Sequence, residues 1–93
     1  VLMALGRPGQ LFAGTMTSNT GAGVPLPIQG CHSITVKADI DNTGLVYIGD
    51  VAVTATGFDL TAGESVTLPV CDASTVYHMA SLDGQTVHYI GVT

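Results

Sequence analysis

The chain has 93 residues, enough for one domain with one modest hydrophobic core. Two basic residues against seven acidic ones give a formal net charge of −5, which argues against nucleic-acid binding and against docking on an anionic membrane, since both rely on Lys and Arg. No run approaches the 18 apolar residues of a membrane span, so we expect a soluble protein.

The composition also predicts association with a partner. Charged residues make up 10% of the chain, whereas a typical soluble domain has about 25%, and apolar residues make up 46%. A folded monomer of this size exposes roughly 5,000 Å², of which so few charged side chains cover only about a quarter. Because monomers seldom leave large apolar patches in water, we expect a homo-oligomer or a subunit of a larger assembly.

The first third of the chain predicts an arm and a linker. A turn at Arg7-Pro8-Gly9 precedes one short strand-like run, Leu11 to Thr17. Residues 18–30 then hold three glycines and two prolines without a charge, a composition that excludes helix. The predicted organisation is therefore an extended N-terminal arm over residues 1–30 and a β-sandwich domain over residues 31–93.

The sandwich domain opens with a clear two-residue period. Residues 33–40 alternate polar and apolar, which predicts a strand with one buried face, and residues 41–44 form a turn. A second strand is expected over residues 45–48. A kink at residues 49–50 precedes a further extended run over residues 51–54.

Glycine turns divide the remaining sequence. Phe58 and Leu60 are expected to plug the core from a loop, and residues 65–70 alternate again. Residues 75–82 and 86–92 predict a hairpin closed at Asp83-Gly84. Nothing has a helical period, so the predicted fold class is all-β, a small antiparallel sandwich or barrel.

The order of long and short connections resembles that of an immunoglobulin-like or jelly-roll-like sandwich. In such a sandwich the strand at 33–40 lies antiparallel to the strand at 65–70. Pairing Val36 with Val66 keeps the inward rows of both strands on one face. The same register places Cys31 opposite Cys71, so a disulfide between them and two reduced thiols are both open.

The search for chemistry finds no candidate site. His32, His78 and His88 are far apart in sequence, and even if strand pairing brings His78 near His88, two histidines without a third ligand make a poor metal site. The run Asp39 to Gly44 has the look of a calcium loop, but strands flank it and its pattern is incomplete. No nucleophile elbow or phosphate-binding glycine loop occurs. We therefore expect no enzyme, no cofactor and no metal.

One stretch carries a family resemblance. The segments VYIG (46–49), VAVT (51–54), GFDL (57–60), GESVTL (63–68) and TVY (75–77) together resemble small β-sandwich virion proteins of tailed bacteriophages. The resemblance covers residues 31–93 and implies a structural virion protein. The members in question are capsid decoration (cement) proteins and minor capsid proteins. It further implies assembly in the host cytoplasm and a position on the capsid surface, commonly as a homotrimer.

The arm is the candidate contact region. An uncharged segment rich in glycine and proline suits a strand that becomes ordered against a neighbouring subunit or the major capsid protein, although a flexible tail is the alternative. The residues expected to make such contacts are Leu2, Leu5, Leu11, Phe12, Val24, Leu26 and Ile28. A different function, a receptor- or carbohydrate-binding module of a tail fibre or cell surface, would need exposed aromatic platforms, and the chain has no Trp.

Overall fold

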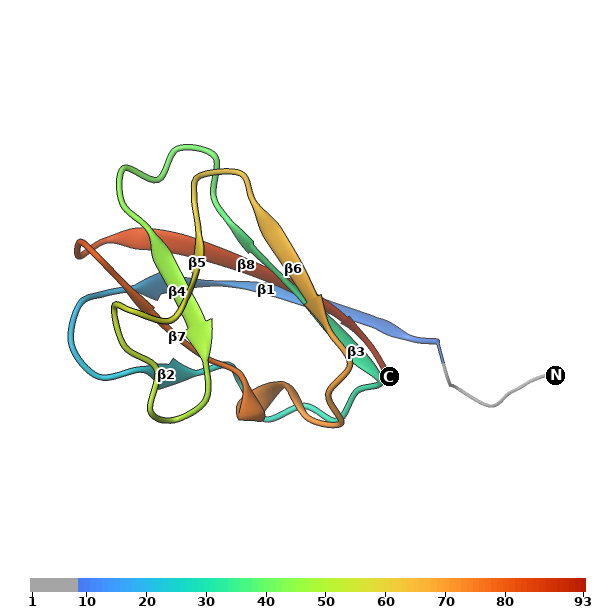
Figure 1. Cartoon of the computed structure of the whole chain (residues 1–93). Helices are drawn as coiled ribbons and strands as arrows, with labels where there is room; N and C mark the ends of the chain where they lie inside the picture. Colours follow the sequence, from blue (N-terminus) through green and yellow to red (C-terminus); the bar gives the residue numbers. More distant parts are fainter. Residues whose placement is uncertain (1–8) are drawn as a thin grey trace, which may run out of the picture.

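A computed structural model describes residues 9–93, and it folds into two antiparallel sheets of four strands each. The first sheet has the order β1-β8-β3-β6 and the second has the order β2-β7-β4-β5 (Figure 1). The predicted fold class, an all-β antiparallel sandwich, is confirmed. The strands are β1 (Leu11–Ser18), β2 (Val24–Pro25), β3 (Ser33–Ala38), β4 (Val46–Gly49), β5 (Phe58–Leu60), β6 (Ser65–Leu68), β7 (Tyr77–Ala80) and β8 (Gln85–Val92).

The helical content of the described residues is a single 3-10 turn, η1 (Ala73–Thr75), which precedes β7. Asp72 caps this turn, because its carboxylate accepts hydrogen bonds from the Ser74 N–H at 2.9 Å and from the Ser74 hydroxyl at 2.7 Å. The part of the chain that the structure describes contains no helix long and apolar enough to cross a membrane.

The core lies between the two sheets and follows the alternation of the strands. In β3, Ile34, Val36 and Ala38 are fully buried and point at the second sheet, while the residues between them face outward. The predicted register is confirmed, because Ile34 pairs with Leu68 and Val36 with Val66. The buried apolar residues of the core are Leu26, Ile34, Val36, Ala38, Val46, Ile48, Leu60, Ala73, Val76 and Val87.

The predicted arm at residues 1–30 is not a separate unit in its described part, and the boundary at residue 31 is wrong. All eight residues of β1 pair with β8, so this strand completes the first sheet. Leu26 is only 1% exposed and lies in the core, and its N–H donates to the Val76 carbonyl at 3.0 Å. Within the described residues, the sandwich therefore includes the strand that starts at Leu11.

Hydrogen bonds also hold residues 18–30, which the composition predicts to be an extended linker, against the rest of the domain. The N–H and hydroxyl of Thr20 both donate to the Asp83 carboxylate at 2.9 Å, and the Gly84 N–H donates to the Asn19 side chain at 2.9 Å. Further along, the Ala73 N–H donates to the Gln29 carbonyl at 2.9 Å. A composition of glycine and proline excluded helix correctly, but it did not indicate that the segment packs against its own domain.

The predicted hairpin at Asp83-Gly84 is wrong. A turn does occur there, but β7 belongs to the second sheet and β8 to the first, so the connection crosses between the layers. The physical reason is that both edges of β8 are already occupied, one by β1 and the other by β3. A short turn after an alternating strand occurs both in a hairpin and in a crossover between sheets, so the sequence pattern does not distinguish them.

Two smaller expectations also fail. Phe58 is 58% exposed at the start of β5, whereas Leu60 of the same strand is 2% exposed and buried as predicted. Residues 51–54 do not form a strand: they belong to the loop between β4 and β5, where the Val53 side chain lies against Gly49 and Gly23. Because Phe58 pairs with Ile48 at the far end of β4, it lies at the margin of the core rather than inside it.

Candidate functional site

The outer face of the first sheet is a surface of four regular strands with very little charge. Lys37 is the one charged side chain on its four strands when histidine is counted as neutral. Odd-numbered residues of β1, β3 and β6 and even-numbered residues of β8 share this face. We call it the outer face. It consists of Leu11, Ala13, Thr15, Thr17, Ser33, Thr35, Lys37, Ser65, Thr67, Thr86, His88, Ile90 and Val92.

Apolar groups gather at one end of the outer face. Leu11 is 69% exposed and pairs with Val92, and Ala13 pairs with Ile90, which is 45% exposed. Threonines dominate the rest, and Thr35 and Thr67 share a hydroxyl–hydroxyl hydrogen bond of 2.8 Å across neighbouring strands. A surface of this composition makes apolar and hydroxyl contacts and has little attraction for a charged ligand.

The residues predicted to contact other subunits divide into three groups. Leu2 and Leu5 lie outside the described residues. Leu11, Val24 and Ile28 are exposed, Ile28 by as much as 86%, and are available to a partner. The prediction is wrong for Leu26, which is enclosed in the core, and Phe12 is half-buried against that core.

A polar line that the sequence did not reveal crosses the outer face. The His88 Nε2–H donates to the Asp39 carboxylate at 2.7 Å, and His88 Nδ1, which is the acceptor in this tautomer, lies 2.9 Å from the Thr15 hydroxyl. The bond from His88 is the main cause that lowers the pKa of Asp39. The three residues are 24 and 49 positions apart, so only the register of the sheet brings them together.

A hydroxyl, an imidazole and a carboxylate in this order have the composition of a nucleophilic triad. A shallow hollow of about 190 Å³ lies beside His88, and Lys37, Thr35, Ser65, Tyr89 and Ile90 complete its lining. Thr15 is not among these lining residues, so a molecule in the hollow would not meet the hydroxyl. We therefore assign the line to cross-strand pairing of β1 with β8 and of β8 with the end of β3.

His78 and His88, which strand pairing could have brought close, do not come together. His88 lies on the outer face of the first sheet, whereas His78 of β7 points into the sandwich, 1% exposed. His78 Nδ1 lies 2.9 Å from the Ser18 hydroxyl, and Nε2 has no hydrogen-bond partner among the described residues. Within residues 9–93, no three His, Cys, Asp or Glu side chains group as metal ligands.

Burial of His78 predicts that stability falls in mild acid. Desolvation lowers the pKa of this imidazole below its ordinary value of 6.5. Below pH about 6.5 the unfolded state takes up a proton that the folded state resists, so the free energy of unfolding decreases by at most about 1.4 kcal/mol per pH unit. Urea unfolding at pH 7.5 and pH 5 should show this loss, and His78→Gln should reduce it.

The control for this prediction is His32→Gln, because His32 is exposed. This variant should keep the pH dependence of the wild type. If the His78→Gln variant loses as much stability as the wild type between pH 7.5 and pH 5, the assignment to His78 is contradicted.

The two cysteines face each other as the register predicted, but the structure holds them as free thiols. The Cys31 N–H donates to the Cys71 carbonyl at 2.9 Å, and the Cys31 thiol lies 3.2 Å from the Val70 carbonyl. Burial raises the pKa of Cys31, and the charges of Asp72 and Cys71 add to this effect. The sequence left a disulfide and two reduced thiols open, and the structure contains the two thiols.

Alkylation should therefore distinguish the two cysteines. Because thiolate is the reactive form and Cys31 is half-buried with a raised pKa, we expect the exposed Cys71 to react first and Cys31 more slowly. Peptide mapping after a time course of iodoacetamide treatment measures both rates. Native protein that takes up no label until it is reduced would instead demonstrate a Cys31–Cys71 disulfide.

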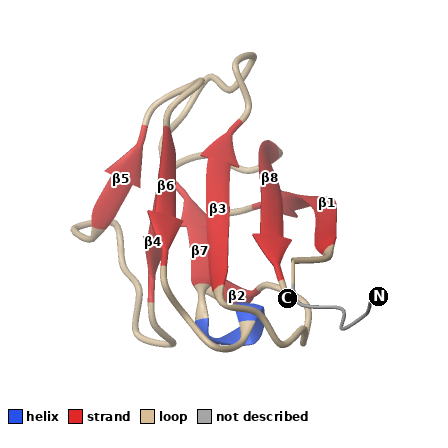
Figure 2. Ribbon diagram, turned by 90° about the vertical axis from the view of Figure 1, so that its right-hand side faces the viewer, coloured by secondary structure: helices blue, strands red, loops and turns tan. Residues whose placement is uncertain are grey.

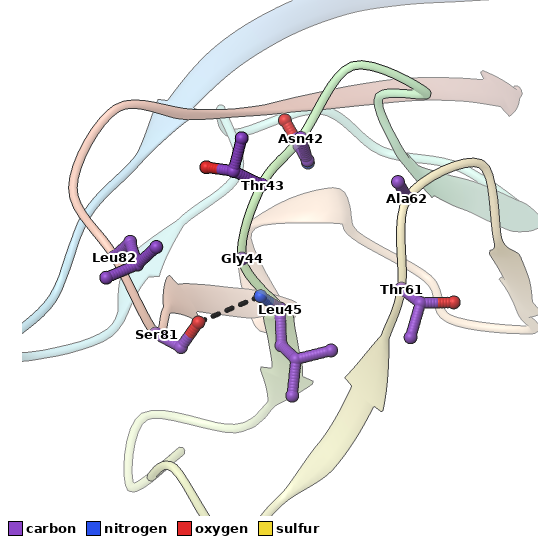
Figure 3. Close-up of a pocket in the computed structure, with 8 residues that line it drawn as sticks. All are labelled: Asn42, Thr43, Gly44, Leu45, Thr61, Ala62, Ser81 and Leu82. Atoms are coloured by element: carbon purple, nitrogen blue, oxygen red, sulfur yellow. Dashed lines mark hydrogen bonds between the residues drawn. The ribbon is translucent and has the colours of Figure 1, made fainter.

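A larger hollow of about 490 Å³ lies at one end of the sandwich, between three loops (Figure 3). Its shape is fixed by polar contacts: the Leu45 N–H donates to the Ser81 hydroxyl at 2.8 Å, and Gln85 Oε1 accepts from the N–H groups of Thr43 and Gly44 at 2.9 Å. The lining contains neither an aromatic ring nor a charged side chain. Its residues are Asn42, Thr43, Gly44, Leu45, Thr61, Ala62, Ser81 and Leu82.

No protein-family model, no curated protein and no solved structure matches the chain.

Proposed function

We propose that the chain is a structural virion protein of a tailed bacteriophage, a capsid decoration protein that stabilises the head lattice. The observation that carries the proposal is the outer face, a regular surface on which Lys37 is the single charged side chain with histidine neutral and where Leu11 and Ile90 stand exposed. The exposed apolar end of this face suits burial against a partner. The segments from VYIG to TVY that resemble phage virion proteins support the same function.

The proposal names the partners and the location. The chain would bind further copies of itself and the major capsid protein, on the capsid surface, after assembly in the host cytoplasm. Its acidic balance supports a partner other than nucleic acid, because the described strands present no basic patch for phosphate. The resemblance to phage proteins implies a homotrimer, and the oligomer number is open to direct measurement.

Mass spectrometry of purified virions tests this function. In the phage whose genome encodes the chain, a decoration protein should occur in a fixed, high ratio to the major capsid protein. Washing the particles in high salt should leave it bound, because the contact surface carries almost no charge to screen. Particles that lack the protein, while it accumulates in infected cells, would contradict the proposal.

A carbohydrate- or receptor-binding module is the alternative. Sugar recognition commonly uses an exposed aromatic ring, and the loop hollow offers none among its lining residues. Binding of the isolated protein to a glycan array would favour this alternative over the decoration protein.

A further inference from the structure

The strand β1 leaves one side of its backbone open. It lies at one margin of the first sheet, beside β8 (Figure 2), and among residues 9–93 no strand pairs with its other side. The Thr93 N–H donates to the Gln10 carbonyl at 2.9 Å. The even-numbered residues of β1 therefore form their main-chain hydrogen bonds with β8. In antiparallel pairing the bonds alternate. The N–H and C=O groups of Leu11, Ala13, Thr15 and Thr17 therefore point to the open side.

This edge has none of the features that normally prevent strand addition. Natural edge strands are short, charged, bulged or interrupted by proline. The other three edges fit this description: β2 is two residues long and contains Pro25, β5 is three residues long and contains Asp59, and β6 is four residues long and ends before Pro69. By contrast, β1 has eight residues, no charge and no proline, and its register with β8 is unbroken.

We propose that a second copy of the chain pairs with β1 in antiparallel fashion, so that the first sheets of two copies join into one sheet of eight strands. The charge distribution favours a second copy as the occupant. Each chain has a net charge of −5, and all seven acidic residues follow residue 38, outside β1 and β3. Two copies that meet at β1 therefore bring together an uncharged part of each chain.

The side chains of β1 determine the register of the pairing. A two-fold axis must pair residues of equal parity, since otherwise the core face of one copy would continue the outer face of the other. An axis at Gly14 pairs Leu11 with Thr17 and Ala13 with Thr15 of the second copy. It satisfies all four open residues in each copy with about eight main-chain hydrogen bonds.

Gly14 fits the position on the axis. The Tyr89 ring of β8 lies over Gly14, and a Cβ at this position would overlap the ring. In the paired form the Tyr89 rings of the two copies would approach each other across the axis, on the core face of the joined sheet. The outer faces of the two copies would then form one continuous surface, with both Leu11 side chains on it.

The pairing has two-fold symmetry, so it predicts a dimer in place of the homotrimer that the resemblance implies. It does not depend on the virion proposal, because it should occur in the isolated protein. The dimer and the virion function can therefore fail separately. The dimer is measured in the isolated protein, and the virion function is measured on particles.

Sedimentation velocity over a series of concentrations tests the proposal with a matched pair of variants. Thr15→Pro removes an N–H from the open side of β1 and leaves the main-chain bonds to β8 intact, a position where proline is tolerated. The matched control is Thr67→Pro on β6. The Ala38 N–H donates to Glu64, so even-numbered residues of β6 bond to β3 and Thr67 also points its N–H outward. Each variant loses one hydroxyl contact, to His88 or to Thr35.

We expect the wild type and Thr67→Pro to become dimers as the concentration rises, while Thr15→Pro stays a monomer. If Thr15→Pro does not fold, Ala13→Glu replaces it, with Thr67→Glu as its control, because Ala13 and Thr67 are both exposed on the outer face. A wild type that is a monomer at every concentration, a wild-type trimer, or a dimer that the folded β1 variants retain would overturn the proposal.

Amide exchange measured by NMR locates the contact. The N–H groups of Ala13, Thr15 and Thr17 should exchange rapidly in dilute protein and slowly in concentrated protein. Equal protection of these amides in the dilute monomer would show that another segment of the same chain occupies the edge, and this would also overturn the proposal.

Discussion

Replacing Leu26 with alanine is expected to lower the free energy of unfolding by about 2–5 kcal/mol, because a fully enclosed leucine leaves a cavity when it is shortened. Leu26 is 1% exposed between the two sheets. It nevertheless lies between Pro25 and Pro27, in a stretch whose composition indicates a linker. Urea unfolding monitored by circular dichroism measures the effect.

Ile28→Ala is the control for this experiment. Ile28 is two residues further along the same stretch and is 86% exposed, so its truncation should change stability by no more than about 0.5 kcal/mol. Equal and small effects at both positions would mean that residues 24–28 do not pack in the core, and the sandwich would then begin after them.

Removing residues 1–30 is expected to abolish cooperative folding. The truncation takes β1 from the first sheet, β2 from the second and Leu26 from the core. It also exposes the edge of β8 and leaves Asp72 and Asp83 without the groups at Gln29 and Thr20 that donate to them. A domain of this size, stabilised by about 5–15 kcal/mol in total, does not survive such a loss.

Circular dichroism and thermal unfolding of the fragment 31–93 measure this result. A sharp thermal transition close to that of the whole chain would contradict the fold described above. The expected result also limits the use of the fragment: its failure to bind a particle would reflect unfolding and would not show that residues 1–30 make the contact. Point variants at exposed positions such as Ile28 and Leu11 are the appropriate probes.

The sequence predicted the central strands well, because each has one buried face. Alternation over residues 33–40 and 65–70 sets which side chains point inward, and a register that slips by one residue would separate the two inward rows. The pairing of Val36 with Val66 and of Ile34 with Leu68 is one of the registers that meet this constraint, and it is the one the structure contains. The placement of Cys31 opposite Cys71 continues the same register beyond the strands.

The sequence was less informative where burial depends on distant partners. A single leucine between two prolines has no periodicity, so nothing local indicated that Leu26 reaches the core. The turn at Asp83-Gly84 was visible, but the choice between a hairpin and a crossover depends on which strands fill the edges of β8. The line from Thr15 through His88 to Asp39 depends on the same assembly, and no motif in the sequence announces it.

The structure places the described part of the predicted extended arm inside the sandwich, with β1 as a strand of the first sheet. Leu11, Val24 and Ile28 are exposed and stay predicted contact residues, but β1 would act as the edge of the sandwich. A rigid edge loses less conformational entropy on association than a disordered arm does. Self-association and capsid binding are therefore expected to use surfaces that already exist in the free protein.

Sedimentation of the folded chain with capsids is the most direct test of the proposed function. Protein labelled at the exposed Cys71 would be mixed with heads assembled from the major capsid protein of the phage that, under the proposed function, encodes the chain. We predict saturable cosedimentation at a fixed number of copies per capsid subunit, together with a higher unfolding temperature of the heads. Labelled protein that is folded, yet stays in the supernatant at every concentration, would contradict its assignment as a decoration protein.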